Sequence, residues 1–237
     1  MAASSEQIKE ILALRDRKVT PKQIARKLGL RPAEVKDIIQ TQLNANPEKY
    51  SQPKKLPKLK ECLIDSQGFD RFFGSQIIKR DRKGLSQVMV TRTDGQHHLV
   101  TTFLIDAWCL GVKNAMGPRK VKTTDYPLMR EQAYATTMDD SYRTISLEQV
   151  QSVIYGAVDY AKHLGIDPHK DFERAKSHLE PRMDNLVRHE FGKNGKPYYF
   201  AGPYDNPEKI IAKLRESVGE GNFKYTVGMD LGMGTVL

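Results

Sequence analysis

The chain has 237 residues, which is enough for one large domain or two small ones. Hydrophobic residues make up 39% of it and charged residues 28%, which excludes a disordered chain, and no apolar run approaches the roughly 18 residues of a membrane span. Cys62 and Cys109 are too few for a disulfide framework or a cysteine-based zinc site. Because the first ten residues lack the apolar core of a signal peptide, we expect a cytoplasmic protein.

The net charge of +9 is concentrated near the N-terminus. Residues 1–60 hold 14 Lys and Arg against six Asp and Glu, a net charge of +8, whereas residues 61–237 have a net charge of +1. A basic module on a nearly neutral body is typical of proteins that bind polyanions. The alternative is that these basic residues form an ordinary solvated surface.

The segment 20–40 has the pattern of two short helices joined by a tight turn. Thr20 and Gln23 have the spacing of a capping box, and Pro21 occupies the first helical position, which proline favours. Gly29 is placed to end this helix, and Pro32 is placed to begin the next one. The apolar residues that would close a small core between the two helices are Ile24, Leu28, Leu30, Val35 and Ile38.

The QIA of residues 23–25, the LGL of residues 28–30 and Val35 resemble the helix-turn-helix of bacterial DNA-binding proteins. The resemblance covers about the first 45 residues and implies DNA binding without naming a target. A preceding amphipathic helix over residues 5–17 supplies the third helix that such a domain needs. We therefore expect a helix-turn-helix domain of three helices over residues 1–44.

The second helix of this motif would enter the major groove of DNA. Arg31, Lys36 and Gln40 would reach bases or phosphates from it. Two acids on the same helix, Glu34 and Asp37, count against this interpretation because they repel phosphates. The residues expected to hold the DNA backbone are Thr20, Lys22, Lys27 and the linker lysines Lys54, Lys55, Lys58 and Lys60.

Residues 45–60 combine three prolines and five lysines with little apolar material, which predicts an extended basic linker. Residues 61–237 then show strands in hairpins around a central block of helices. This order favours an α+β domain, and the chain as a whole is expected to be α+β.

The second domain is expected to contain, in chain order, a strand over 61–65, two strands over 85–92 and 97–108 joined by a turn at 93–96, and helices over 125–138 and 146–165. The pattern then predicts a further helix after Asp167-Pro168 and a hairpin of 186–191 and 196–201 around Asn194-Gly195. The last expected elements are a helix over 206–219 and a strand over 222–229. Capping residues, glycines and the Asn-Gly turn signal set these bounds.

Three strings in this domain resemble a family of uncharacterised bacterial proteins: CLGVK at 109–113, GIDPHKDF at 165–172 and GKPYYFAGPY at 195–204. The similarity spans roughly residues 61–230. It implies a recurring domain, with no activity and no catalytic residue to carry over.

Asp106, Lys113, His169 and Tyr198 form a possible functional cluster. A carboxylate inside the apolar FLIDAWCL run needs a partner if it is buried, and Lys113, His169 or an arginine would supply one. A structural ion pair is favoured over a catalytic one. Cys109 likewise fits packing better than nucleophilic chemistry.

Tyr198 belongs to an aromatic stretch, residues 198–204, that has Lys193, Lys196 and Arg188 near it. Such a mixture can stack nucleobases, although alternation along a strand would place half of the rings in the core. The histidines lack the spacing of a zinc site, so no metal is expected. No cofactor is expected either.

These patterns favour a DNA-binding protein, a bacterial transcriptional regulator or architectural factor, that acts through its basic N-terminal domain. One alternative is an RNA- or ribosome-associated factor that uses the same basic module. Another is an enzyme with its site around Asp106 and His169. We expect a nucleic-acid partner, with DNA favoured over RNA, and no membrane partner. A homodimer is compatible with these patterns.

Overall fold

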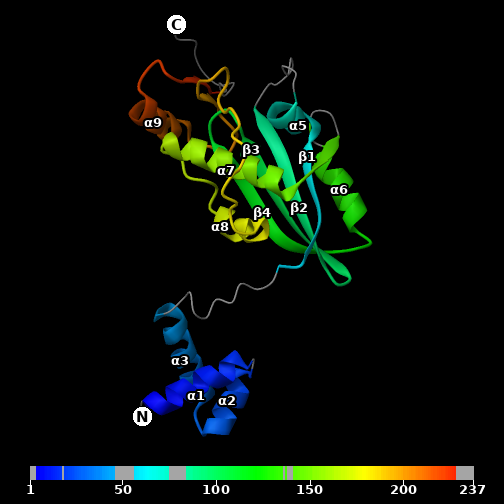
Figure 1. Cartoon of the computed structure of the whole chain (residues 1–237). Coiled ribbons are helices and arrows are strands. Elements are labelled where there is room, and N and C mark those ends of the chain that lie inside the picture. The colour runs from blue at the N-terminus through cyan, green and yellow to red at the C-terminus, as the bar shows by residue number, and fades with distance from the viewer. Residues whose placement is uncertain are drawn as a thin grey trace. The chain divides into compact units, whose positions relative to one another are not determined.

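The computed structural model describes residues 4–17, 19–45, 56–74, 84–135, 137 and 141–227. The chain divides into two compact units, Met1–Lys55 (unit 1) and Leu56–Leu237 (unit 2), which are described separately (Figure 1). Helices and an antiparallel sheet are both present, which confirms the α+β class.

The described residues of unit 1 form three helices, α1 (Ser5–Asp16), α2 (Pro21–Leu28) and α3 (Pro32–Ala45). The expected capping box begins α2, since Gln23 N–H donates to the Thr20 hydroxyl at 3.4 Å and Thr20 N–H donates to Gln23 Oε1 at 3.1 Å. Gly29 ends this helix in the left-handed conformation, with φ of +65°. The three helices close on the buried side chains Ile11, Leu14, Ile24, Ala25, Val35 and Ile39.

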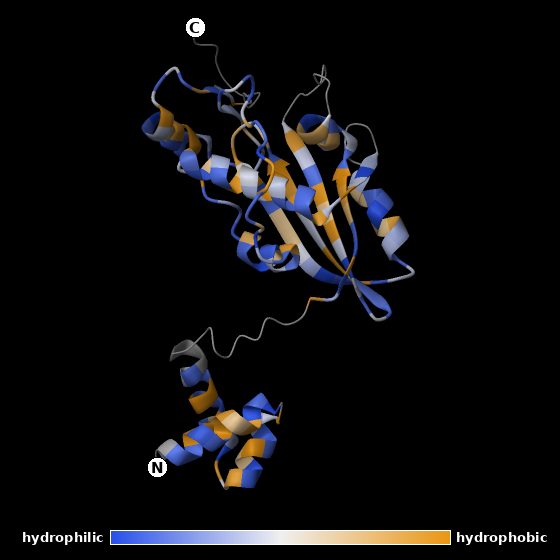
Figure 2. Cartoon of the chain, in the orientation of Figure 1, coloured by the Kyte–Doolittle hydropathy of each residue, from blue (hydrophilic) through white to orange (hydrophobic). Residues whose placement is uncertain are grey.

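Unit 2 is built on a five-stranded antiparallel sheet with the strand order β4-β3-β2-β1-β5. Its strands are β1 (Lys58–Asp65), β2 (Leu85–Asp94), β3 (His97–Asp106), β4 (Gly111–Lys122) and β5 (Tyr142–Ile145). The expected turn between β2 and β3 is present, with Asp94 and His97 as the last pair of the ladder. The central strands mix apolar residues, which appear orange in Figure 2, with polar ones.

Helices cover both faces of the sheet (Figure 1). They are α5 (Ser66–Phe73), α6 (Tyr126–Tyr134), α7 (Leu147–His163) and α8 (Phe172–Ala175) with a 3₁₀ turn at Lys176–Leu179. A further helix, α9 (Pro207–Val218), packs in a second core. One face packs Val88, Val90 and Phe103 against α7 and α8. The other face packs Leu63 and Met89 against the tyrosines of α6.

A second, smaller core lies beyond the edge of the main sheet. Two short strands, β6 (Tyr198–Phe200) and β7 (Lys224–Thr226), pair in parallel there. Tyr199, Leu214 of α9 and Phe223 are buried in this core together with Cys109. Ala161 and Leu164, at the end of α7, also belong to it and join the two cores.

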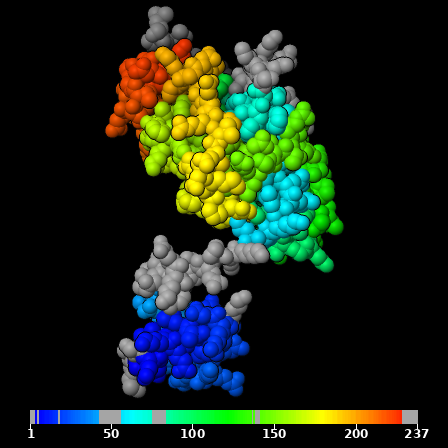
Figure 3. Space-filling model, viewed as in Figure 1, coloured from blue at the N-terminus to red at the C-terminus, as the bar shows by residue number. Residues whose placement is uncertain are grey.

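The prediction of a hairpin over 186–191 and 196–201 is wrong. Lys193 and Lys196 do close a tight turn at Asn194-Gly195, but 186–191 contains no strand and β6 pairs with β7 instead. Residues before the turn pack on helices: His189 lies against Phe72, and Phe191 stacks on Tyr160 of α7. Figure 3 shows this part of the chain, yellow to orange, on the surface between α7 and the cyan α5.

Several expected boundaries also differ. The strand β1 begins at Lys58, so the last three residues of the range expected as a linker belong to the sheet. The helix expected after Asp167-Pro168 begins only at Phe172. The strands β4 and β5 were not expected at all, and residues 46–55 of the linker lie outside the described ranges.

Candidate functional site

The exposed face of α3 carries two of the residues expected to bind DNA. Val35 and Ile39 are buried in the core of unit 1. Lys36 and Gln40, each one position further along, are exposed. Because they are four residues apart, they are neighbours on one face of the helix. Lys36 therefore projects from unit 1 beside Gln40, as the sequence pattern predicts.

Arg31 lies just before α3 and is bound to an acid. Its Nη2 lies 2.7 Å from Glu34 Oε1, and its backbone N–H donates to Glu34 Oε2 at 3.2 Å. The hydrogen bond from the guanidinium lowers the pKa of Glu34. The Arg31 side chain is 78% exposed, so water competes for this pair and a phosphate could displace the carboxylate.

The remaining basic residues expected to contact the DNA backbone fall into separate groups. Lys22 and Lys27 are exposed on α2, whereas the Thr20 hydroxyl is already engaged in the capping box and donates to Gln23 Oε1 at 2.8 Å. Lys58 and Lys60 are exposed on β1 and thus belong to unit 2. Lys54 and Lys55 lie outside the described residues.

A cleft of about 670 Å³ in unit 2 brings together three of the four residues of the expected functional cluster. Asp106 comes from the end of β3, Lys113 from the start of β4, and His169 from the segment before α8. The end of β6 and the loop 201–205 line the cleft as well, including the almost fully exposed Tyr204.

Asp106 is a buried carboxylate that holds a turn. Its Oδ1 accepts N–H bonds from Trp108 at 2.9 Å and Cys109 at 3.0 Å. Burial raises its pKa to about 6, although these N–H donors and the charge of Lys113 act in the opposite direction. A carboxyl group in this state can exchange a proton near neutral pH.

Lys113, one of the partners expected for Asp106 beside His169 or an arginine, forms its ion pair with Asp205 instead. Lys113 Nζ lies 2.7 Å from Asp205 Oδ2, an atom that also accepts the Gly202 N–H at 2.7 Å. Asp205 lies 92 residues after Lys113. Sequence reasoning missed it, because the only local signal, Asp-Asn-Pro, indicates a helix start.

His169 is fixed next to the cleft by the backbone. Its N–H donates to the Val112 carbonyl at 2.9 Å, and its Nδ1 accepts the Asp171 N–H at 3.3 Å. The imidazole, the Lys113–Asp205 pair and Asp106 together give the cleft both acidic and basic groups.

Tyr198 belongs to a different place from the other three residues. Its ring packs edge to face with Trp108 at 5.5 Å between centroids. Its hydroxyl is hydrogen-bonded to Thr226 Oγ1 at 2.8 Å. Tyr199 is fully buried while Tyr198 and Phe200 are half-buried, so the expected alternation along this strand is present.

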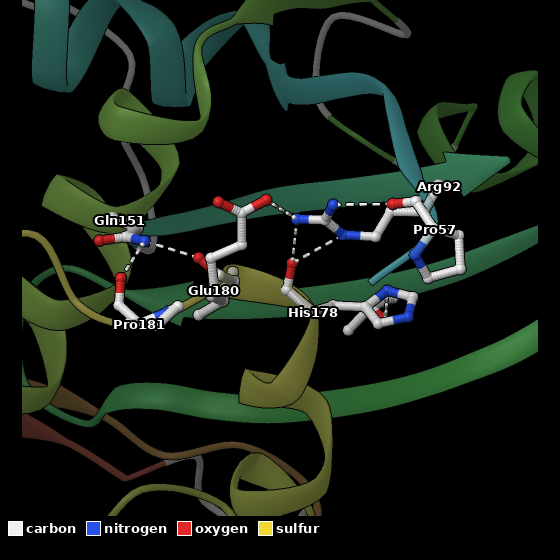
Figure 4. A network of polar contacts seen from close by, with 8 residues as sticks. Pro57, Arg92, Gln151, His178, Glu180 and Pro181 are labelled. Atoms are coloured by element: carbon white, nitrogen blue, oxygen red, sulfur yellow. Dashed lines mark hydrogen bonds and ion pairs between the residues drawn. The ribbon is translucent and has the colours of Figure 1, made fainter. Parts of the chain in front are cut away.

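A second buried polar cluster is a structural clamp (Figure 4). Arg92, only 2% exposed, donates to the carbonyls of Pro57 and His178 and forms an ion pair with Glu180 at 2.7 Å. The His178 ring bonds to Thr101 Oγ1 at 2.9 Å, and burial lowers its pKa to about 4. These contacts fasten the chain around 176–181 to the sheet.

Among the described residues, no group of three or more His, Cys, Asp and Glu could hold a metal ion. No helix in the described ranges has the length and apolar character of a membrane span. Comparisons of the chain with protein-family models, curated proteins and solved structures find no match. Function is therefore inferred from the residues and contacts of the chain itself.

Proposed function

We propose that this chain is a DNA-binding protein of the helix-turn-helix type, a bacterial transcriptional regulator or architectural factor, and that unit 1 contacts duplex DNA. The observation that carries the proposal is the arrangement of α2 and α3. Only residues 29–31 separate these two helices, and the first of them is a left-handed glycine. Short turns of this kind join the two helices of a helix-turn-helix.

The exposed charge on these helices supports the same proposal. Lys22 and Lys27 on α2 and Lys36 on α3 are all exposed. In this arrangement α3 enters the major groove with Lys36 and Gln40 toward the bases, while the α2 lysines hold phosphates. Arg31 joins them once it leaves Glu34.

The test is a selection of preferred sequences from random duplex DNA by the full chain, followed by affinity measurements. On the selected duplex, Lys36→Ala should lose on the order of 1–3 kcal/mol of binding free energy, and less on random duplex. Lys9→Ala, an exposed lysine of α1, is the matched control and should change both affinities little.

Replacing Lys54 and Lys55 together with alanine should lower the affinity for all duplex sequences alike. If about four to six cations meet phosphates, log K against log salt has a slope of roughly −4 to −5, which this double variant makes shallower by about 2. If selection yields no preferred duplex while a structured RNA binds more tightly at matched salt, the DNA proposal fails and the RNA alternative replaces it.

A second candidate function is supported by the cleft of unit 2. Asp106, with its raised pKa, lies in one cleft with His169 and the Lys113–Asp205 pair, as an enzyme site or a ligand site would require. The discriminating measurement is a small-molecule screen by thermal shift. We would favour this candidate if a compound raises the unfolding temperature of the unchanged chain but not of His169→Ala. The control Lys170→Ala, a variant of the exposed neighbouring residue, should keep the shift.

A further inference from the structure

Three lysines surround a separate hollow of about 410 Å³ in unit 2. The hollow lies between the Asn194-Gly195 turn and the start of the β6–β7 ladder. Its lining residues are Lys193, Asn194, Lys196, Pro197, Tyr198 and Lys224, which we call the lysine pocket. No acidic side chain is among these residues.

The backbone brings the three lysines together. Lys193 and Lys196 are directly paired across the tight turn, with N–H to carbonyl distances of 2.8 and 3.3 Å, so their side chains leave the same face. Tyr198 and Lys224 are register partners in the parallel ladder and share a face for the same reason. The Lys224 N–H also donates to the Pro197 carbonyl at 2.9 Å, which joins both pairs.

Lys193 is held by aromatic rings rather than by a carboxylate. Its Nζ lies 4.3 Å from the centroid of Trp108 and 4.4 Å from that of Tyr198. A cation–π contact positions an ammonium group but leaves its charge uncompensated. Lys196 and Lys224 are exposed, and within the described residues none of the three lysines forms an ion pair.

The pocket thus differs from the nearby cleft, where Asp205 neutralises Lys113 at 2.7 Å. Three ammonium groups that form no ion pair with a described residue surround one concave surface, and such a concentration of positive charge raises the local concentration of anions. Lysine binds phosphate oxygens as a compact charge with three donors. The half-buried ring of Tyr198 at the wall adds an apolar surface beside those charges.

We propose that the lysine pocket binds the phosphate groups of a nucleotide, either a free nucleotide or one residue of a single-stranded nucleic acid. The ammonium groups of Lys196 and Lys224 contact the phosphates, and Lys193 reaches the same group from its place over Trp108. The base lies against the wall formed by Tyr198 and Pro197. This site is in unit 2 and does not depend on the function proposed for unit 1.

The chain contains its own probe, because Trp108 is its single tryptophan and contacts Lys193 directly. The full chain is titrated with inorganic triphosphate, with ATP and with a single-stranded oligonucleotide while Trp108 emission is recorded. We expect saturable changes with triphosphate and ATP. If the oligonucleotide saturates at much lower concentration than ATP, the source is a strand; the reverse order indicates a free nucleotide.

The variant Lys196→Ala/Lys224→Ala removes two exposed charges and leaves Lys193 and its rings in place. Its affinity for the stronger ligand should fall at least about tenfold, the loss expected for hydrogen bonds to a charged group. The matched control Lys162→Ala/Lys209→Ala removes two exposed lysines elsewhere in unit 2 and should keep its affinity within about twofold.

Three results would overturn the proposal. One is a Trp108 emission that responds to none of the three ligands. Another is an equal loss of affinity in the pocket variant and the control. The third is a response to polyglutamate as strong as that to ATP at matched charge and ionic strength, since the pocket would then be a site for acidic peptides.

Discussion

Glu34 is the residue that most directly opposes the proposed DNA contacts of unit 1. It binds Arg31 through both the guanidinium and the backbone N–H. Glu34→Gln keeps an oxygen that can accept the backbone N–H, while it removes the charge that holds the guanidinium. We expect the duplex affinity of this variant to rise on the order of fivefold at low salt, because Arg31 becomes available to a phosphate and a repulsive charge is lost.

The control for this prediction is Glu10→Gln, which makes the same charge change at an exposed position of α1. A gain of equal size in both variants would mean that total charge alone matters. Filter-binding or anisotropy titrations of the two variants at several salt concentrations separate these outcomes.

Asp106 makes the stability of unit 2 depend on pH. Its pKa of about 6 in the folded protein exceeds the unfolded value of about 3.9, so the folded state binds this proton more tightly. The stability that this proton provides is therefore lost as the pH rises from about 4 to about 6.

Asp106→Asn removes the titrating group and keeps an oxygen for the Trp108 and Cys109 N–H groups. Relative to the unchanged chain, the variant should gain roughly 2–3 kcal/mol between pH 4 and pH 7. Urea unfolding followed by Trp108 emission measures this difference for unit 2. Parallel pH profiles of the two proteins would show that Asp106 titrates normally.

Elements with strong capping signals could be predicted from the sequence. The capping box at Ser146 and Gln149 begins α7, and Asn206 caps α9, both as expected. The strand β4 was missed because its sequence, GVKNAMGPRKVK, contains two glycines and a proline and does not alternate. It lies at the edge of the sheet, where proline and lysine are tolerated.

The Asn194-Gly195 turn shows the limit of local signals. Both residues have positive φ, as the turn type requires, yet the ladder does not extend because the flanking residues pack on other elements. Local signals are equally insufficient to predict the cleft. Asp106 and Lys113 could be selected by residue type and burial, but their proximity to Asp205 arises only from the fold.

Gly29 is the residue on which the α2–α3 turn depends. A Cβ at this position would meet nothing within 4 Å, so the cost of Gly29→Ala comes from the left-handed backbone alone. That cost is about 1–2 kcal/mol of unfolding free energy for unit 1. Gly29→Asn should lose less, because asparagine tolerates this conformation.

Thermal unfolding of the full chain, followed by helical circular dichroism, checks this prediction. Gly95→Ala is the control: this glycine also has positive φ (+60°) and open space around it, but it lies in the β2–β3 turn of unit 2. It should lower the unfolding temperature of unit 2 alone. An unchanged melting curve of unit 1 in Gly29→Ala would show that the turn is not required.

The two units of the chain differ sharply in charge balance. Residues 1–55 carry 12 basic and six acidic residues, whereas residues 56–237 carry 26 basic and 23 acidic ones. The position of the boundary matters for experiments, because a cut at residue 60 would remove Lys58 and Lys60 from β1. Fragments should therefore be divided between Lys55 and Leu56.

The central claim is that unit 1 binds duplex DNA, and the affinity of the two fragments for one duplex tests it most directly. Fragments 1–55 and 56–237 are compared with the full chain at one salt concentration. We expect fragment 1–55 to keep most of the affinity and fragment 56–237 to lose it, even though the lysine pocket remains intact there. If fragment 56–237 binds the duplex as tightly as the full chain does, the claim is contradicted.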